Sequence, residues 1–222
     1  MIEFHDVSKT FAGRPAASHL NLHFAEGAFS VLIGTSGSGK SSFLRAGLLA
    51  RLQRDTVRFV VLPTLRPGRA ALTGPTGLER SLGLGGLPLD GTTISERLAQ
   101  FRQPVAPRSH EQASRPDESV AAEPPTMVLP IDQAEELFLA GDEEAKKAVI
   151  LLAKVMEADQ NLLLLLTIRS DSLSFLQSNP ILSAFQRRLF DLPPLSAAAF
   201  KEIIKGPAGI SKSGIEIQPE LV

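Results

Sequence analysis

Apolar and polar residues alternate along two early segments of the chain, 2–7 and 19–24. In the second segment Leu20, Leu22 and Phe24 lie on one face and polar residues on the other, which is the period of a half-exposed strand. We predict two strands here, antiparallel to each other. Further along, the alternation gives way to short and almost wholly apolar runs, which are typical of strands covered on both faces. These runs are 29–33, 57–62, 127–131 and 162–168.

Between these runs, apolar residues recur at helical spacing. The segment after residue 41 has four such positions, and its arginines lie on the wetter side. These residues are Phe43, Leu44, Leu48 and Leu52, with Arg45, Arg51 and Arg54 opposite. Residues 142–157 form a second amphipathic pattern, and shorter ones span 76–82 and 94–101. Strands that alternate with helices predict an α/β fold with three layers, a mostly parallel sheet and N-terminal antiparallel strands.

Residues 103–125 interrupt this alternation. The segment is polar, rich in proline and without periodicity, so burial cannot offset the entropy that would be lost on ordering it. We interpret it as a disordered or loosely held insertion. Because another apolar strand follows it, both halves are predicted to belong to one domain, which spans 1–205.

A glycine-rich segment follows the strand at 29–33 and precedes the first helix. It fits the pattern G-x-x-x-x-G-K-[ST] of a phosphate-binding loop, whose backbone N–H groups surround phosphate oxygens. Lys40 would reach the β- and γ-phosphates, and Ser41 would ligate Mg²⁺. The segment therefore predicts a site for a nucleoside triphosphate with Mg²⁺. Its residues are Gly34, Thr35, Ser36, Gly37, Ser38, Gly39, Lys40, Ser41 and Ser42.

A phosphate loop of this kind needs an acidic metal anchor, and Asp132 directly follows the apolar run 127–131. Hydrolysis also needs a group that orients or deprotonates water. The next residue, Gln133, can orient water but cannot accept its proton. Glu135 or Glu136 would take that role, and the sequence does not choose between them or exclude a solvated helix start for both.

Arg169 directly follows the apolar run 162–168, so it is expected at the same edge of the sheet as Asp132. There its guanidinium would meet the γ-phosphate and distinguish ATP from ADP, although a surface salt bridge is the alternative interpretation. Arg66 follows the run 57–62 and is a weaker candidate, for which a charged turn is favoured.

From residue 34 onward the sequence resembles the novel STAND NTPases, signal-transduction ATPases found in large bacterial regulators. The resemblance lies in the phosphate loop, Arg66-Pro67-Gly68, Asp132-Gln133-Ala134-Glu135-Glu136-Leu137-Phe138, Thr167-Ile168-Arg169 and Lys205-Gly206-Pro207. It implies ATP as the nucleotide, Lys40 and Ser41 on phosphate and Mg²⁺, Asp132 on Mg²⁺, and Arg169 as a sensor. It also implies that 206–222 begins a helical lid, with effector domains of a longer protein or a second copy as partners.

Residues 1–42 instead resemble the start of an ABC transporter ATPase, in Ile2-Glu3-Phe4-His5-Asp6-Val7 and in Phe11. That resemblance implies that Phe11 stacks on adenine, whereas the sequence alone allows a plain strand-end hydrophobe equally well. The rest of the chain departs from that family, because no Leu-Ser-Gly-Gly-Gln signature precedes Asp132 and no histidine follows His110. A membrane partner is expected only under this alternative.

Composition narrows the function classes further. The 222 residues have a formal net charge of −1 and no stripe of lysine and arginine, so nucleic-acid binding is not expected. The sequence has no cysteine, no signal-peptide pattern and no apolar run long enough to span a bilayer, so a cytoplasmic location is expected. The favoured function is a switch domain that binds ATP and hydrolyses it slowly with Mg²⁺. The alternatives are a transporter-like ATP-binding subunit and a non-catalytic nucleotide-binding module.

Overall fold

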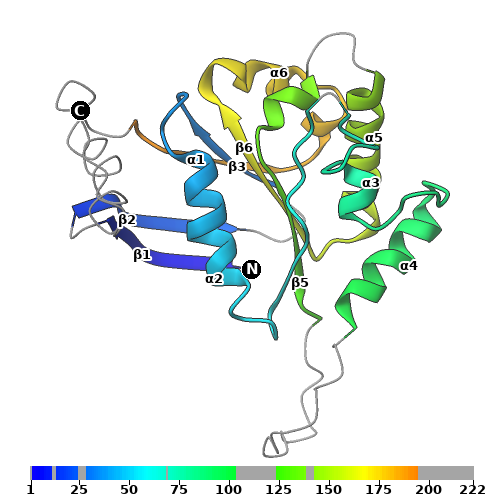
Figure 1. The fold of residues 1–222 in the computed structure, drawn as a ribbon, viewed down its shortest axis with the longest axis horizontal. Coiled ribbons are helices and arrows are strands. Elements are labelled where there is room, and N and C mark those ends of the chain that lie inside the picture. Colours follow the sequence, from blue (N-terminus) through cyan, green and yellow to red (C-terminus); the bar gives the residue numbers. More distant parts are fainter. Residues whose placement is uncertain are drawn as a thin grey trace, which may run out of the picture.

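A computed structural model describes residues 2–11, 14–24, 29–68, 70–103, 124–138 and 143–194 of the chain. Its centre is a sheet of five strands with helices on both faces (Figure 1). In spatial order the strands are β4 (Phe59–Val61), β5 (Thr126–Ile131), β6 (Leu162–Arg169), β3 (Phe29–Gly34) and β7 (Arg187–Asp191). All neighbouring pairs are parallel, which confirms the predicted α/β fold.

The two faces of the sheet carry different helices. A continuous helical segment covers one face and consists of α1 (Lys40–Ser42), a π-helical stretch (Phe43–Leu49) and α2 (Ala50–Leu52). The opposite face carries α3 (Leu78–Ser81), α4 (Gly91–Arg102) and α5 (Glu143–Ala158) (Figure 1). Shorter helical turns complete the described chain: Ala134–Phe138, Ser170–Ser172, α6 (Leu173–Ser178) and Leu182–Ala184.

Alternate residues of the central strands supply the two cores. Val31 and Ile33 of β3 belong to the core beneath α5, whereas Leu32 belongs to the core beneath the helical segment that begins at Lys40. Because successive side chains of a strand point to opposite faces, only an almost wholly apolar strand can serve both cores. This is the physical reason for the continuous apolar runs in the sequence.

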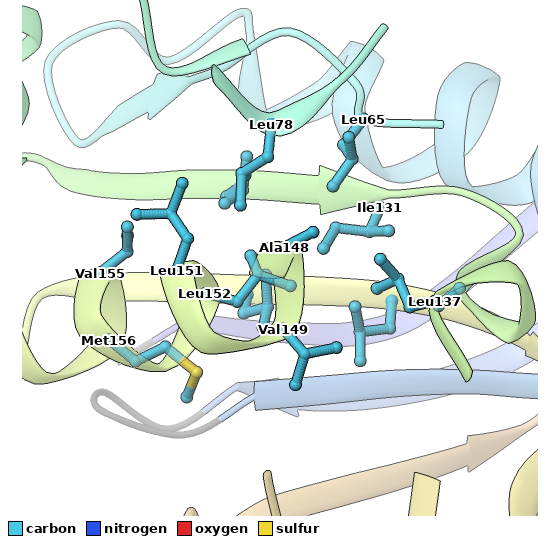
Figure 2. Packing of buried hydrophobic residues seen from close by; sticks show 14 of the residues in the cluster. Leu65, Leu78, Ile131, Leu137, Ala148, Val149, Leu151, Leu152, Val155 and Met156 are labelled. Carbon is cyan, nitrogen blue, oxygen red and sulfur yellow. The ribbon is translucent and has the colours of Figure 1, made fainter. Parts of the chain in front are cut away.

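Helix α5 buries the apolar stripe expected from its sequence. Ala145, Val149, Leu152 and Met156 are all buried, and Ala148, Leu151 and Val155 widen the stripe. Figure 2 shows the α5 side chains from Ala148 to Met156 gathered with Ile131 of β5. Leu65, which lies before α3, and Leu78, in its first turn, belong to the same cluster. The burial of each large aliphatic side chain contributes roughly 1.5–3 kcal/mol, so this stripe fixes α5 on the sheet.

The N-terminal strands form their own sheet, drawn to one side of the main one in Figure 1. Strands β1 (Ile2–Phe11) and β2 (Arg14–Phe24) are antiparallel, as predicted, and both are longer than the alternating segments. No helix within the described part of the chain is long and apolar enough to cross a bilayer.

The prediction for 57–62 is wrong in extent. Val57 is 82% exposed, and β4 begins only at Phe59 and is half-buried. The reason is its position at the edge of the sheet, where β5 is its only neighbour among the described strands, and a turn in which Arg58 donates to Asp55 precedes it. The helical pattern at 76–82 is realised only as α3. The predicted insertion and lid fall mostly or wholly outside the described residues.

Candidate nucleotide-binding site

Three strand ends meet at the carboxyl edge of the sheet. Strand β6 lies between β3 and β5, and the register places Gly34 beside Arg169 and Ile131 beside Leu166. The phosphate loop, Asp132 and Arg169 therefore emerge at one edge, where ligands of open parallel sheets bind.

The loop between β3 and α1 is shaped by its glycines. Gly37 and Gly39 have φ angles of +81° and +82°, a conformation that residues with a side chain rarely adopt. At Gly34 a Cβ atom would lie 2.8 Å from the backbone oxygen of Leu192, so a larger residue does not fit. Thr35, Ser36 and Gly37 are exposed at the tip, whereas Ser38 is buried at its base.

Lys40 folds back over this loop. Its Nζ donates to the carbonyl oxygens of Gly34 at 2.8 Å and Thr35 at 2.7 Å, and to Ser38 Oγ at 3.4 Å. Burial lowers the pKa of Lys40, and the nearby charge of Glu135 opposes this shift. All three acceptors are neutral oxygens, so an anionic phosphate placed at the loop would be a stronger partner for the ammonium group.

Asp132 is completely buried and accepts from four donors. Its Oδ1 accepts from Ser41 Oγ at 2.7 Å and from Thr167 Oγ1 at 2.8 Å. Its Oδ2 accepts from the guanidinium groups of Arg45 and, at 3.2 Å, Arg66. Burial alone would raise the pKa of Asp132, but the hydrogen bonds from Ser41 and Thr167 and the charge of Arg45 outweigh it. The pKa therefore lies below its ordinary value, and the carboxylate is ionised at neutral pH.

The sequence did not predict either arginine contact. Arg45 was expected on the wetter side of its helix, and Arg66 in a charged turn. Arg66 reaches the site because the chain continues along β5 beyond β4, with Leu65 N donating to the Pro130 oxygen and Asp132 N donating to the Leu65 oxygen. A signal for Arg45 was available, since it lies four residues after Ser41 and hence on the same side of the helix.

Three polar residues that follow Asp132 have different surroundings. Gln133 is exposed, has a φ angle of +62°, and donates its backbone N–H to Thr167 Oγ1 at 3.0 Å. Glu136 accepts from the backbone N–H of Gly68 at 2.5 Å. Glu135 has a buried Oε2 atom without a hydrogen-bond partner among the described residues, and its charge acts on Lys40. The structure thus separates two glutamates that the sequence left equivalent.

Arg169 forms a surface salt bridge, which is the alternative that the sequence offered to a contact with the γ-phosphate. Its Nη2 donates to Asp171 Oδ2 at 2.5 Å, and both side chains are about half-exposed. Arg169 nevertheless pairs with Gly34 across β6 and β3, so it emerges beside the phosphate loop, and its charge adds to the lowering of the Lys40 pKa that burial mainly causes. Ser42 is exposed on the first turn of the helix. For Phe11 the structure describes only the backbone at the end of β1, so its contact with adenine stays a prediction.

These residues suit a magnesium ion that arrives with phosphate. Within the described residues no group of three or more histidine, cysteine, aspartate or glutamate side chains could cage a metal. One carboxylate beside one hydroxyl, Asp132 beside Ser41, is instead the small protein contribution typical of Mg²⁺ bound through substrate phosphates.

A phosphate loop after β3 and a buried acid after β5, in a parallel α/β sheet, define a P-loop NTPase that binds nucleotide. The chain belongs to the family described as novel STAND NTPase 1, whose model matches residues 4–222.

Shorter similarities connect the chain to transport ATPases. It is 64% identical over 45 residues to the glycine betaine uptake system ATP-binding protein YehX of Escherichia coli (strain K12), which covers 20% of this chain and 15% of that protein. It is 47% identical over 47 residues to the phosphonates import ATP-binding protein PhnC of Bacillus cereus (strain ATCC 10987 / NRS 248), covering 21% and 18%. The chain therefore matches less than a fifth of the length of either relative.

Two solved structures are similar over most of the chain. The bacterial ABC transporter cassette MJ0796 has 18% identity and a TM-score of 0.43, covering 87% of this chain and 94% of that one. The ORC1 protein of Aeropyrum pernix, solved in complex with DNA, has 17% identity and a TM-score of 0.49, covering 82% and 44%.

Proposed function

We propose that this domain binds Mg-ATP at the carboxyl edge of its sheet, hydrolyses it slowly, and acts as a switch between two nucleotide states. The observation that carries the proposal is the hydrogen bond from Ser41 to Asp132. It joins the residue expected to ligate Mg²⁺ to the residue expected to anchor it, directly beside the loop that holds Lys40.

Different residues of the site would bind the phosphates and the metal. Backbone N–H groups of residues 34–41 would hold phosphate oxygens, and the Lys40 ammonium would exchange its neutral acceptors for them. Asp132 would orient Ser41 and the metal. When bound, Mg²⁺ neutralises charge on the phosphates.

For water activation we assign Glu135 rather than Glu136. Glu136 is engaged by the backbone of Gly68, whereas Glu135 has an oxygen without a hydrogen-bond partner among the described residues and faces the field of Lys40. Gln133 would orient the water but cannot take its proton, so the base is not the residue directly after the anchor. This arrangement favours slow turnover, which suits a switch better than a motor.

Arg169 is proposed as the sensor of the γ-phosphate. Its present partner, Asp171, is exposed, and exposed ion pairs contribute only about 0–1 kcal/mol. The guanidinium can therefore leave Asp171 for a phosphate at little cost. We further propose that the domain works in the cytoplasm, where ATP is available, and that effector domains of a longer protein or a second copy read its state.

The test is a thermal melt with and without Mg-ATP, combined with a turnover assay, on the parent and on Lys40→Ala and Asp132→Ala. Ligand at about 100 times Kd should stabilise the parent by about 2.7 kcal/mol. Both variants should lose most of this effect. A parent without any ATP-dependent shift would contradict the proposal, a shift without turnover would indicate a non-catalytic binding module, and turnover only with a second nucleotide-binding domain would favour a transporter-like subunit.

A further inference from the structure

We propose that Arg45 and Arg66 act as a built-in counter-ion for Asp132, which keeps free divalent metal off the carboxylate until a nucleotide is bound. The inference rests on the proposed function, because it concerns how the metal reaches the same site. It assigns a role to Arg45, which the sequence did not select, and a new role to Arg66, which the sequence offered only as a weaker candidate for the γ-phosphate.

The hydrogen-bonding positions of the Asp132 carboxylate are already occupied. An ionised carboxylate has about four lone-pair positions, and Asp132 has four donors within hydrogen-bond reach. Ser41 and Thr167 share one oxygen, and the two guanidinium groups share the other. A metal ion cannot approach Oδ2 unless an arginine leaves.

The local charge also opposes the binding of a free metal ion. One carboxylate with two guanidinium groups carries a net charge of +1 locally, so a bare divalent cation meets net repulsion at a site where it needs attraction. An isolated ionised Asp132, completely buried, would be costly in the absence of metal. The arginines therefore stabilise the metal-free site and oppose metal binding through the same contacts.

The two arginine side chains have room to move away from Asp132. The side chains of Arg45 and Arg66 are 42% and 44% exposed, whereas Asp132 is fixed and fully buried. Either guanidinium can turn toward solvent or toward an incoming anion without unpacking the core. Arginine matches phosphate oxygens as well as it matches a carboxylate. A metal nucleotide therefore supplies two new partners. Its phosphates can pair with the arginines, and its metal ion can pair with Asp132.

The experiment uses Mn²⁺ alone as the probe, measured by electron paramagnetic resonance on nucleotide-free protein. The parent should bind Mn²⁺ weakly, and the double variant Arg45→Gln/Arg66→Gln should bind it at least about tenfold more tightly, because two nearby like charges are removed. Arg51→Gln is the matched control, an exposed arginine of the same helical segment, and should behave like the parent. Adding Asp132→Asn to the double variant should abolish the gain.

A parent that binds Mn²⁺ alone as tightly as the double variant would overturn the inference, and so would a gain that survives Asp132→Asn. If the double variant does not fold, Arg66→Lys and Arg66→Gln are compared singly. The lysine variant keeps the charge and should still exclude Mn²⁺, whereas Arg66→Gln should bind it more tightly, and equal affinity in the two would count against the inference. Binding of Mg-ATP to the parent, measured separately by the thermal shift, fails if the proposed function is wrong, independently of these Mn²⁺ affinities.

Discussion

Ser41 Oγ lies 2.7 Å from Asp132 Oδ1, although 91 positions separate the two residues in the sequence. The same carboxylate oxygen accepts from Thr167 at 2.8 Å. Ser41 lies in the helix that follows β3, Asp132 follows β5, and Thr167 lies in β6. One carboxylate oxygen therefore links the ends of three neighbouring strands. The geometry of the site therefore depends on how the whole sheet is packed, and several consequences can be measured.

Replacing Thr167 by valine should weaken the fold and the site together. The hydroxyl donates to Asp132 and accepts from the backbone N–H of Gln133, and both partners would lose it in a buried location. We expect the free energy of unfolding to fall by about 1–3 kcal/mol, measured by urea denaturation. Thr167→Ser, which keeps the hydroxyl, is the control and should lose about 0.8 kcal/mol through the missing methyl group. Equal losses would show that packing alone sets the effect.

The Gln133→Gly variant should be more stable against unfolding than the Gln133→Ala variant. Its φ angle of +62° lies in the left-handed region, where a side chain costs about 1–2 kcal/mol. Gln133→Gly removes this strain, although it also adds freedom to the unfolded chain, so a net gain of up to about 1 kcal/mol is expected. Gln133→Ala keeps the Cβ atom and should not show the gain. Denaturant midpoints of the three proteins provide the measurement, and an alanine variant as stable as the glycine variant would contradict the strain.

Replacement of Glu135 and replacement of Glu136 should affect the ATP turnover number differently. Glu135→Gln should lower the ATP turnover number by about a hundredfold or more while leaving nucleotide affinity close to that of the parent, because a proton acceptor is lost and no phosphate contact is removed. Glu136→Gln is the matched variant and should stay within a few fold, since its carboxylate serves the backbone of Gly68. Steady-state turnover with separate binding measurements would decide, and the reversed pattern would move the base to Glu136.

Asp90 should make the stability of α4 depend on pH. The backbone N–H of Thr93 donates to Asp90 Oδ1 at 2.8 Å, and this bond is the main reason that the pKa of Asp90 lies below its ordinary value of 3.8. The stabilisation is complete above that value and is lost as the pH falls through the lowered pKa, because the unfolded chain then binds the proton first.

Asp90→Asn keeps a capping oxygen without the titration, and Asp90→Ala removes the cap at every pH. The parent should therefore melt above the alanine variant at neutral pH and approach it in acid, whereas the difference between asparagine and alanine should not change. A gap between parent and alanine that is constant with pH would remove Asp90 from the acid dependence.

The elements of the main sheet were predictable where the pattern was local and strong. β6 and α5 follow directly from a nearly continuous apolar run and from a helical stripe, since each is buried as its pattern requires. The run at 57–62 has similar composition, yet only three of its residues form β4. Its place at the sheet edge, which the sequence does not encode locally, decided how much of it is paired.

The sequence by itself determined the phosphate loop, the strand that Asp132 follows, and the family, because each depends on residues that are neighbours in the chain. Tertiary structure alone decided which groups surround Asp132. Its donors include Arg45, Arg66 and Thr167, which are 87, 66 and 35 positions away in the sequence. Glu135 and Glu136 are neighbours in the sequence, and only their different surroundings in the fold distinguish their roles. A buried carboxylate must find donors wherever the fold brings them, and that choice is made by the packing of parallel strands rather than by local spacing.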